Sequence, residues 1–439
     1  MSGTHTGRPL PGAARAARPQ RWWYGWGLLC VLVPAALPLR AQQAPGVAPA
    51  AAPAVATESA PGVGRITPFV DDTETYDDNV FRISNQVNPL TTTGYPSRAD
   101  SYNVVSGGVS ADVPVSLQRF DASVAFNSSH YDRFHELDFN GYDLRGSWLW
   151  AVGRNLSGEI GITDTYSLAS FAELLSVVPD RLKVREVFAK GSWLIGPEWK
   201  LYADADQLVQ TNSDPAVQYN NVTVDSLETS LSHVIGTANW VGLDARYESG
   251  HFPDGEPEGS ELIDNGYDQW SGGLVIDWGA DTPSHLVARA DQVSRRYDEL
   301  SQRDFDLTTA YIQYTWTPSG RVALTAIAER EISPYEFVHS SIVLVKGIIL
   351  RPILHLTAKI DLSADLEAVT RSYLSDPGLV LGLELPRVDQ VHTATALLTY
   401  RPIDKLLLQL SATHEERTSN ILYGGYLDNV YWFKVRLTL

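Results

Sequence analysis

The amino-acid sequence predicts an all-β protein: a single closed antiparallel transmembrane β-barrel of about 18 strands, with 16 as the alternative count. Three observations predict it. Apolar and polar side chains alternate with a period of two, large aromatic residues recur at one place in that alternation, and short turns alternate with long polar loops. Successive side chains of a strand point to opposite faces, so a period of two favours strands over helices.

The clearest alternation runs through residues 354–368. Every second residue from Leu354 to Ala368 is apolar, whereas the residues between them, from His355 to Glu367, are polar and mostly charged. A helix would scatter these residues around its surface. We expect one long strand here with lipid on one face and water on the other, since strands of about 9–11 residues cross a bilayer. A strand of a large soluble sheet is the alternative that this segment leaves open.

The front of the chain predicts export from the cytoplasm. Four arginines between Arg8 and Arg21 precede an apolar run from Trp26 to Leu39, so residues 1–41 are expected to be a signal peptide. That run is shorter than the roughly 20 apolar residues of a spanning helix. Residues 42–64 are rich in Ala and Pro and predict a linker. Residues 65–439 show the β pattern without a break and are assigned to one outer-membrane barrel domain.

The composition excludes several functions. The chain has 52 acidic and 34 basic residues and a formal net charge of −18. Removing residues 1–41, which contain five arginines and no acidic residue, brings the net charge near −23. An acidic chain does not favour nucleic acid as a partner. The single cysteine, Cys30, lies inside the predicted signal peptide, so the mature chain has no disulfide and no cysteine metal site.

Turn residues predict the number of strands. Short breaks with Gly, Pro or Asn recur between longer polar connections, as in barrels with short periplasmic turns and long extracellular loops. A first strand within residues 66–75 and a last within 428–439 bring the total to about 18. The eight expected short turns lie at residues 114–119, 152–155, 196–198, 236–239, 280–284, 317–320, 351–353 and 401–404.

Large aromatic residues stand at the last outward position before several of these turns. Each shares its parity with the apolar residues of its strand. Amphipathic rings prefer the boundary between hydrocarbon and water, where barrels carry aromatic girdles. This regularity is hard to explain by a soluble core and favours the membrane barrel. The predicted girdle consists of Trp150, Trp193, Trp278, Trp316 and Tyr400.

The opposite parity predicts a hydrated lumen of both charge signs with an acidic excess. Barrels of about 16–18 strands leave an aqueous channel. Carboxylates and aromatic rings in such a channel suit hydroxyl-rich sugars. For any single residue, simple solvation and cross-strand pairing of the charges is the more economical explanation. The candidate lumen residues are Lys200, Tyr202, Asp204, Asp206, Asp244, Arg246, Arg289, Asp291, Tyr311, Lys359, Asp361, Asp365, Lys434 and Arg436.

Nothing in the spacing of residues predicts catalysis or a metal site. The segment from His414 to Arg417 lacks the second histidine of a helical zinc motif, and no Ser-His-acid arrangement is arguable from spacing. The oxygens at Asp77–Asn79 could hold a cation, but a role in a loop turn is favoured. We expect no enzyme activity, no metal and no cofactor, with a barrel hydrolase as the least favoured alternative.

Several segments resemble a family of barrel proteins from polysaccharide gene clusters. The segment Phe69–Arg82 contains Asp77-Asp78-Asn79-Val80-Phe81-Arg82, which is similar to the opening of EpsL-type, exosortase B-associated exopolysaccharide biosynthesis transporters of the beta-barrel porin 2-like group. Residues 156–158, 167–172 and 185–199, with Gly191-Ser192-Trp193, also have the look of that family. Strand spacing is compatible to the C-terminus, so the resemblance spans nearly the whole predicted mature chain.

The resemblance implies export of an extracellular polysaccharide across the outer membrane. The expected partners are then outer-membrane lipid, the polysaccharide and periplasmic export machinery, and the mechanism is passive conduction. The alternative is a general or solute-specific diffusion porin, which physical reasoning from the residues alone favours.

Overall fold

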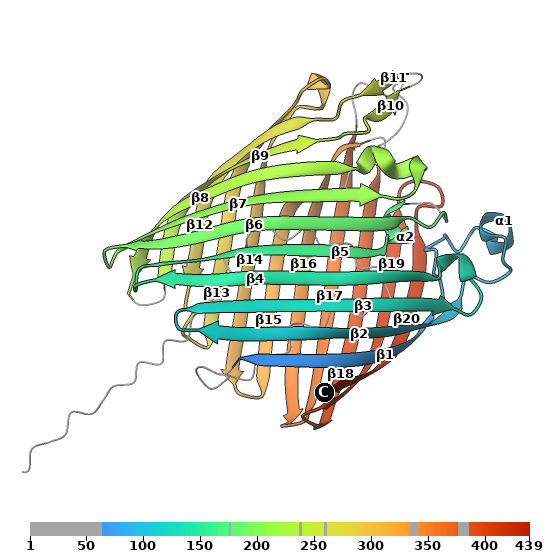
Figure 1. Cartoon of the computed structure of the whole chain (residues 1–439). Helices are drawn as coiled ribbons and strands as arrows, with labels where there is room; N and C mark the ends of the chain where they lie inside the picture. Colours follow the sequence, from blue (N-terminus) through green and yellow to red (C-terminus); the bar gives the residue numbers. More distant parts are fainter. Residues whose placement is uncertain (1–63, 175–176, 237–238, 259–260, 334–339, 376–385) are drawn as a thin grey trace, which may run out of the picture. The chain divides into compact units, whose positions relative to one another are not determined.

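The computed structural model is a closed antiparallel β-barrel of 18 strands, as the sequence predicts (Figure 1). The structure describes residues 64–174, 177–236, 239–258, 261–333, 340–375 and 386–439. Each barrel strand pairs with its neighbour along the chain, and β1 pairs with both β2 and β20. The predicted signal peptide and linker lie outside the described residues.

The barrel strands are longer than the five or six residues usual in soluble sheets. They are β1 (Arg65–Asp77), β2 (Asp100–Val115), β3 (Gln118–Tyr131), β4 (Phe139–Val152), β5 (Leu156–Leu168), β6 (Arg181–Ile195), β7 (Trp199–Asn212), β8 (Val222–Ile235), β9 (Asn239–His251), β12 (Tyr267–Trp278), β13 (Ser284–Tyr297), β14 (Phe305–Ser319), β15 (Val322–Ser333), β16 (Ser340–Thr357), β17 (Ile360–Ser375), β18 (Val388–Ile403), β19 (Leu406–Ser419) and β20 (Tyr426–Thr438).

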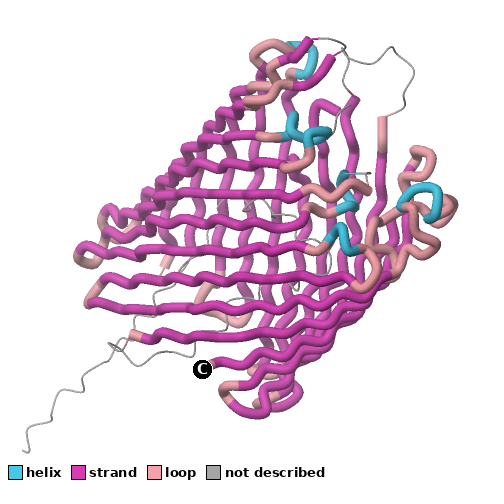
Figure 2. The backbone as a smooth tube through the Cα atoms, turned by 45° about the vertical axis from the view of Figure 1, so that its right-hand side comes forward, coloured by secondary structure: helices cyan, strands magenta, loops and turns pink. Residues whose placement is uncertain are grey.

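Short turns join the strands at one end of the barrel and long loops join them at the other (Figure 2). The long loops carry the short elements α1 (Pro89–Thr93), η1 (His135–Leu137), α2 (Phe171–Leu174), η2 (Pro215–Asn220) and η3 (Ser301–Arg303), and the hairpin of β10 (Glu256–Glu258) with β11 (Glu261–Ile263). No helix among the described residues has the length and apolar character needed to cross a membrane.

Burial alternates along the strands and defines the two faces of the wall. On β8, Leu227 and Leu231 are exposed, whereas Glu228 and Ser230 between them are buried. On β20, Tyr431 and Phe433 are exposed and their neighbours on the other parity are buried. The exterior of the barrel is therefore apolar over most of each strand, and most polar residues of the same strands face inward.

The expected single strand over residues 354–368 is wrong, and so is the expected turn at residues 351–353. β16 continues through 351–353 to Thr357, and the chain turns at residues 358–359. A register shift between His355 and Thr357 adds one residue beside this turn. Because of that bulge, even-numbered residues face outward on both strands, with Leu354 directly opposite Leu362. Even-numbered residues are therefore the outward ones both before and after the turn.

The other seven expected short turns coincide with or adjoin connections in the structure. Register shifts like that beside Thr357 occur near the turns of β14–β15 and β18–β19. At Gly153 and Gly196 the backbone has a positive φ of 66°, a conformation in which a side chain is strained. Segment 340–350, which has apolar residues on both parities, forms the start of β16, where Ile342, Val343 and Leu344 are all buried.

The Asp77–Arg82 motif closes the barrel between its first and last strands. Arg82 is 5% exposed and ion-pairs with Asp77 at 2.9 Å and with Asp428 of β20 at 2.8 Å. Burial acts to lower the pKa of the Arg82 guanidinium, but the two carboxylates outweigh it and hold that pKa above its ordinary value. Arg82 also has a positive φ of 54°, so the two ion pairs hold a strained backbone in place.

The remaining polar residues of the motif bind backbone across the same seam. Asp78 accepts hydrogen bonds from the backbone nitrogen and the Nδ2 of Asn429, both at 2.7 Å. Asn79 donates to the carbonyls of Ile83 and Leu427, both at 2.9 Å. The carboxylates of Asp77, Asp78 and Asp428 lie close enough for a shared cation, but Arg82 already supplies the positive charge there. The contacts of this motif are thus those of a loop turn and not those of a cation site.

Replacing Arg82 with Met should destabilise the barrel by about 3–5 kcal/mol, because two buried carboxylates lose their cation. Urea unfolding of the refolded protein measures this. The matched control is Arg119→Met: Arg119 pairs with Asp112 at 2.9 Å but its side chain is 43% exposed, so about 0–1 kcal/mol is expected. Equal losses in the two variants would contradict the role of the seam.

Candidate functional site

The candidate site is the inner wall of the barrel, where most of the predicted lumen residues are on the inward parity. Lys200, Tyr202, Asp204 and Asp206 follow one another along β7. The Tyr202 hydroxyl donates to Asp204 at 3.0 Å, and the Lys200 Nζ lies 5.1 Å from the ring centre of Trp240. Asp244 and Arg246 of β9, Arg289 and Asp291 of β13 and Tyr311 of β14 continue this wall.

Two arginines connect the carboxylates of this wall. Arg289 contacts Glu228 at 3.1 Å, Asp244 at 2.6 Å and Asp291 at 2.5 Å, each through a different nitrogen. Arg246 contacts Glu248 at 2.8 Å, Glu228 at 3.7 Å and Asp206 at 4.0 Å. We call these two arginines and their five carboxylates the arginine hub. Its five acids against two cations keep an acidic excess on the wall.

A glycine makes the centre of the hub possible. Gly273 of β12 lies directly opposite Asp244 on one side and Asp291 on the other. A Cβ at Gly273 would lie 1.9 Å from the carbonyl oxygen of Ala290 and 2.4 Å from Asp291 Oδ1. Only glycine at residue 273 therefore leaves room for the Asp291 carboxylate in the position from which it pairs with Arg289.

Sequence analysis did not single out Glu228 and Glu248, although both belong to the hub. The inward position of Glu228 could have been predicted from the sequence, because Ser226, Glu228 and Ser230 alternate with Leu227 and Leu231 on β8, and the two leucines are exposed. The contact between Glu228 and Arg289 could not have been predicted, since these residues lie on strands far apart in the sequence.

Other predicted lumen residues form separate pairs. Asp361 contacts His355 at 2.7 Å and Arg401 at 2.6 Å near the short turns. Asp365 pairs with Arg351 at 2.8 Å. Neither pair includes a residue of the arginine hub.

Two further candidates lie on β20 and one is misplaced. Arg436 donates to Asp71 at 2.7 Å, and Lys434 is buried on the same parity. Lys359 is not on the inner wall: it lies in the turn after β16, and its Nζ donates to the carbonyl of Pro402 at 2.6 Å. The expectation of a lumen position for Lys359 is a consequence of the wrongly placed turn at residues 351–353.

The predicted girdle residues stand at the short-turn ends of their strands. Trp193, Trp278, Trp316 and Tyr400 are exposed by 49, 46, 42 and 39%. Trp150 is less exposed, since it lies opposite Gly158 and its ring occupies the space that a Cβ at Gly158 would need. Exposed rings at one level of the exterior are the arrangement expected at a membrane interface, a role that stays a prediction.

The loop between β5 and β6 is fixed to a distant part of the wall. Arg417 of β19 donates a hydrogen bond from Nη1 to the carbonyl of Ala172 in α2. The Arg417 side chain is fully buried, and its Nε donates to Asp389 of β18 at 2.9 Å. Five barrel strands separate β5 from β19, so this latch requires the loop to reach inward across the long-loop end.

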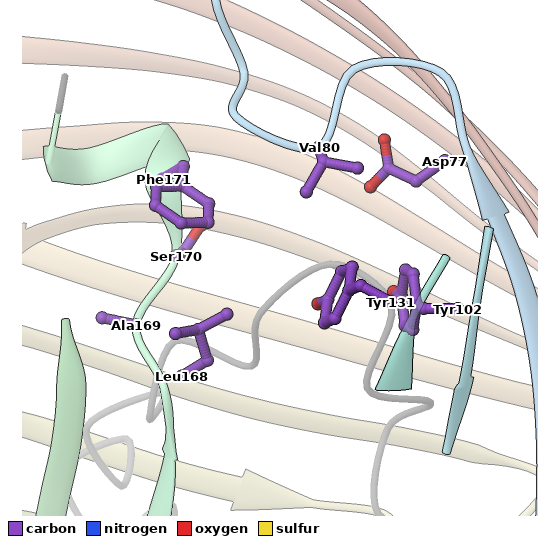
Figure 3. A pocket seen from close by; sticks show the side chains of 8 residues that line it. All are labelled: Asp77, Val80, Tyr102, Tyr131, Leu168, Ala169, Ser170 and Phe171. Atoms are coloured by element: carbon purple, nitrogen blue, oxygen red, sulfur yellow. The ribbon is translucent and has the colours of Figure 1, made fainter. Parts of the chain in front are cut away.

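An apolar cluster supports the latch from the other side. Phe81 of the β1–β2 loop packs edge-to-face on Phe134 and on Phe171 of α2, with ring centres 4.8 and 4.9 Å apart. Tyr102 and Tyr131 stack beneath them at 4.5 Å. The cavity beside Tyr102, Tyr131 and Phe171, shown in Figure 3, has a volume of about 10 Å³, which holds about one water molecule. It is therefore packing space and not a ligand site.

Comparisons with solved structures find similarity to outer-membrane proteins. A BenF-like porin from Pseudomonas fluorescens Pf-5 has a TM-score of 0.47 at 9% identity and covers 86% of this chain and 99% of its own. OccK2 (OpdF) of Pseudomonas aeruginosa has a TM-score of 0.47 at 11% identity, with coverage of 85% and 98%.

The alcaligin outer-membrane receptor FauA of Bordetella pertussis has a TM-score of 0.41 at 13% identity, with coverage of 84% of this chain and 76% of its own. Similarities at this level do not bear on what the chain carries. No family model and no curated protein matches the sequence.

Replacing Arg289 with Gln should make the barrel more selective for cations, because Glu228, Asp244 and Asp291 lose their shared positive charge. One unit charge at about 4 Å in water contributes about 1 kcal/mol, so the permeability ratio of K⁺ to Cl⁻ should rise by up to about fivefold. Reversal potentials in a salt gradient measure it. The exterior variant Arg185→Gln is the control and should leave the ratio unchanged; an equal change in both would refute the local effect.

Replacing Arg417 with Met should release the β5–β6 loop and raise single-channel conductance. A hydrogen bond from a charged donor contributes about 1.5–3 kcal/mol, so the ratio of released to latched loop should rise about tenfold to hundredfold. The control is Arg351→Met, another inner-wall arginine with a carboxylate partner at 2.8 Å. Unchanged conductance and noise in the Arg417 variant would show that the latch does not restrict the pore.

Proposed function

We propose that the chain is an outer-membrane channel for hydrophilic solutes, and that its cargo is an extracellular polysaccharide leaving the cell. The observation that carries the membrane location is the exterior of the barrel. Large apolar side chains such as Leu243 of β9 and Phe126 of β3 are exposed by more than 60% there, while the charged residues of these two strands face inward. Contact of these apolar side chains with water would be unfavourable by about 25 cal/mol per Å² of apolar surface.

The inner wall supports passage of a polar cargo. Its carboxylates can accept hydrogen bonds from the hydroxyl groups of a sugar. The export role further rests on the resemblance of the Asp77–Arg82 motif to polysaccharide-associated barrels. In this proposal, periplasmic machinery delivers the polymer, outer-membrane lipid surrounds the barrel, and nucleic acid takes no part.

A solute-specific diffusion porin is the second candidate, and one observation favours it. The latch from Arg417 to Ala172 holds a loop across the long-loop end, where it would stand in the way of a bulky polymer. Small solutes would pass such an opening without moving the loop. An exporter would need the loop displaced while the polymer passes.

Lipid contact predicts an unequal cost for the same mutation on neighbouring residues. Leu410 is 54% exposed on the exterior parity of β19, and Gln409 is on the inward parity. Leu410→Arg should cost about 2–4 kcal/mol in vesicles, since arginine near the bilayer centre is unfavourable by that amount. Gln409→Arg, the control, should cost less than about 1 kcal/mol. Equal costs in urea unfolding of vesicle-reconstituted protein would refute the membrane exterior.

Planar-bilayer recordings separate the two candidates. With the exporter, polysaccharide purified from the producing cells should block the ion current in a concentration-dependent way, and deletion of the gene should abolish surface polysaccharide while small-solute uptake is unchanged. If the chain is a diffusion porin, the polysaccharide should leave the ion current unchanged, and deletion of the gene should slow the uptake of a small solute. Conduction without polymer block would refute export.

A further inference from the structure

Two basic residues face each other on the exterior of the barrel without an acidic neighbour. Arg330 of β15 and Lys346 of β16 are direct cross-strand partners. Like charges at directly opposed positions destabilise a sheet, with Cβ atoms about 4.5–5.5 Å apart. Neither side chain forms an ion pair with any described residue: the Arg330 Nε donates to the carbonyl of Thr308 at 2.9 Å, and Lys346 is exposed.

The residues around the pair do not neutralise it. In the same row of the exterior, Arg330 lies opposite Ala310 and Lys346 lies opposite Thr370. Glu329 and Glu331 flank Arg330 in the sequence, but their parity places them on the inner face of the wall. A protein with a formal net charge of −18 thus has two adjacent exterior cations that no carboxylate of the described residues compensates.

Other exterior arginines are compensated. Arg185 of β6 pairs with Asp164 of β5 at 2.8 Å, and Arg296 of β13 pairs with Asp306 of β14 at 2.9 Å. The pair of Arg330 and Lys346 therefore differs from these sites in lacking a carboxylate partner.

The position of the pair identifies the kind of partner. Between it and the short turns, the exterior rows of β15 and β16 are all apolar: Val322 with Leu354, Leu324 with Pro352, Ala326 with Leu350 and Ala328 with Ile348. The pair is the first charged row above this apolar band, on the side of the long loops. In a barrel whose long loops are extracellular, that level is the headgroup region of the outer leaflet.

We propose that Arg330 and Lys346 bind a phosphorylated headgroup of an outer-leaflet lipid. A guanidinium can offer two parallel N–H groups to a phosphate, and an ammonium on the adjacent strand adds a point charge. One phosphate between the two side chains converts their mutual repulsion into attraction. The lipid's acyl chains then lie along the apolar rows below, on Ala328 and Ile348. This inference rests on the membrane location in the proposed function but not on conduction.

Native mass spectrometry of the detergent-solubilised full chain tests the site with bisphosphorylated lipid A as the probe. Each basic residue near an anionic lipid surface contributes about fivefold in affinity. The double variant Arg330→Gln and Lys346→Gln should therefore bind lipid A about twenty-fivefold more weakly. Arg185→Gln, which removes a cation already paired with Asp164, should bind like the wild type. Equal binding by the double variant, or an equal loss in the Arg185 variant, would overturn the proposal.

A second variant keeps the test independent of folding defects. Lys346→Glu places a carboxylate opposite Arg330, so it should raise the thermal stability in lipid-free detergent while it weakens lipid A binding. A lipid effect caused by damaged folding would lower both. Inorganic phosphate is the competitor: displacement of lipid A at equal concentrations would show a free-phosphate site and refute the lipid assignment. Failure of the wild type to insert into bilayers refutes the proposed function, whereas normal conduction with unchanged lipid binding by the double variant refutes only this site.

Discussion

The backbone pairing of β1 with β20 is the constraint on which the rest of the molecule depends. A sheet that does not close leaves two edges with unpaired backbone groups, which cannot be tolerated in hydrocarbon and invite aggregation in water. Closure over the register from Phe69 with Thr438 to Asp77 with Val430 removes both edges. It also fixes which parity faces outward on every other strand, because neighbouring strands in register share their faces. The buried Arg82 holds this pairing at the end where the long loops leave the wall.

Closure explains why the fold could be predicted from the sequence. A period of two is a local property that survives in each strand separately, so the barrel, the number of strands and the positions of Trp193, Trp278 and Trp316 at strand ends were all accessible. The turn at residues 358–359 was not. A bulge beside it preserves the parity of the outward residues, and the alternation alone cannot distinguish one long strand from two that meet at such a turn.

The candidate site was accessible only in part, for a related reason. Parity identified Asp244, Arg289 and Asp291 as inward residues, but their meeting depends on Gly273, which carries no side chain and gives no signal in a pattern of apolar and polar residues. Contacts between distant strands, such as Glu228 with Arg289, depend on the three-dimensional arrangement of the wall. The inward loop is the extreme case, because no property of Ala172 indicates that its carbonyl binds an arginine.

The hydrogen bond between Arg417 and Ala172 joins residues 245 positions apart in the sequence, and this separation has a consequence for assembly. The loop can reach its final position only when β18 and β19 are both in the wall, since Asp389 and Arg417 come from these strands. Contacts of such long range require the entropy of closing the intervening chain to be overcome. A barrel that lacks either strand therefore lacks this latch, and the position of the β5–β6 loop reports on the completeness of the C-terminal part of the wall.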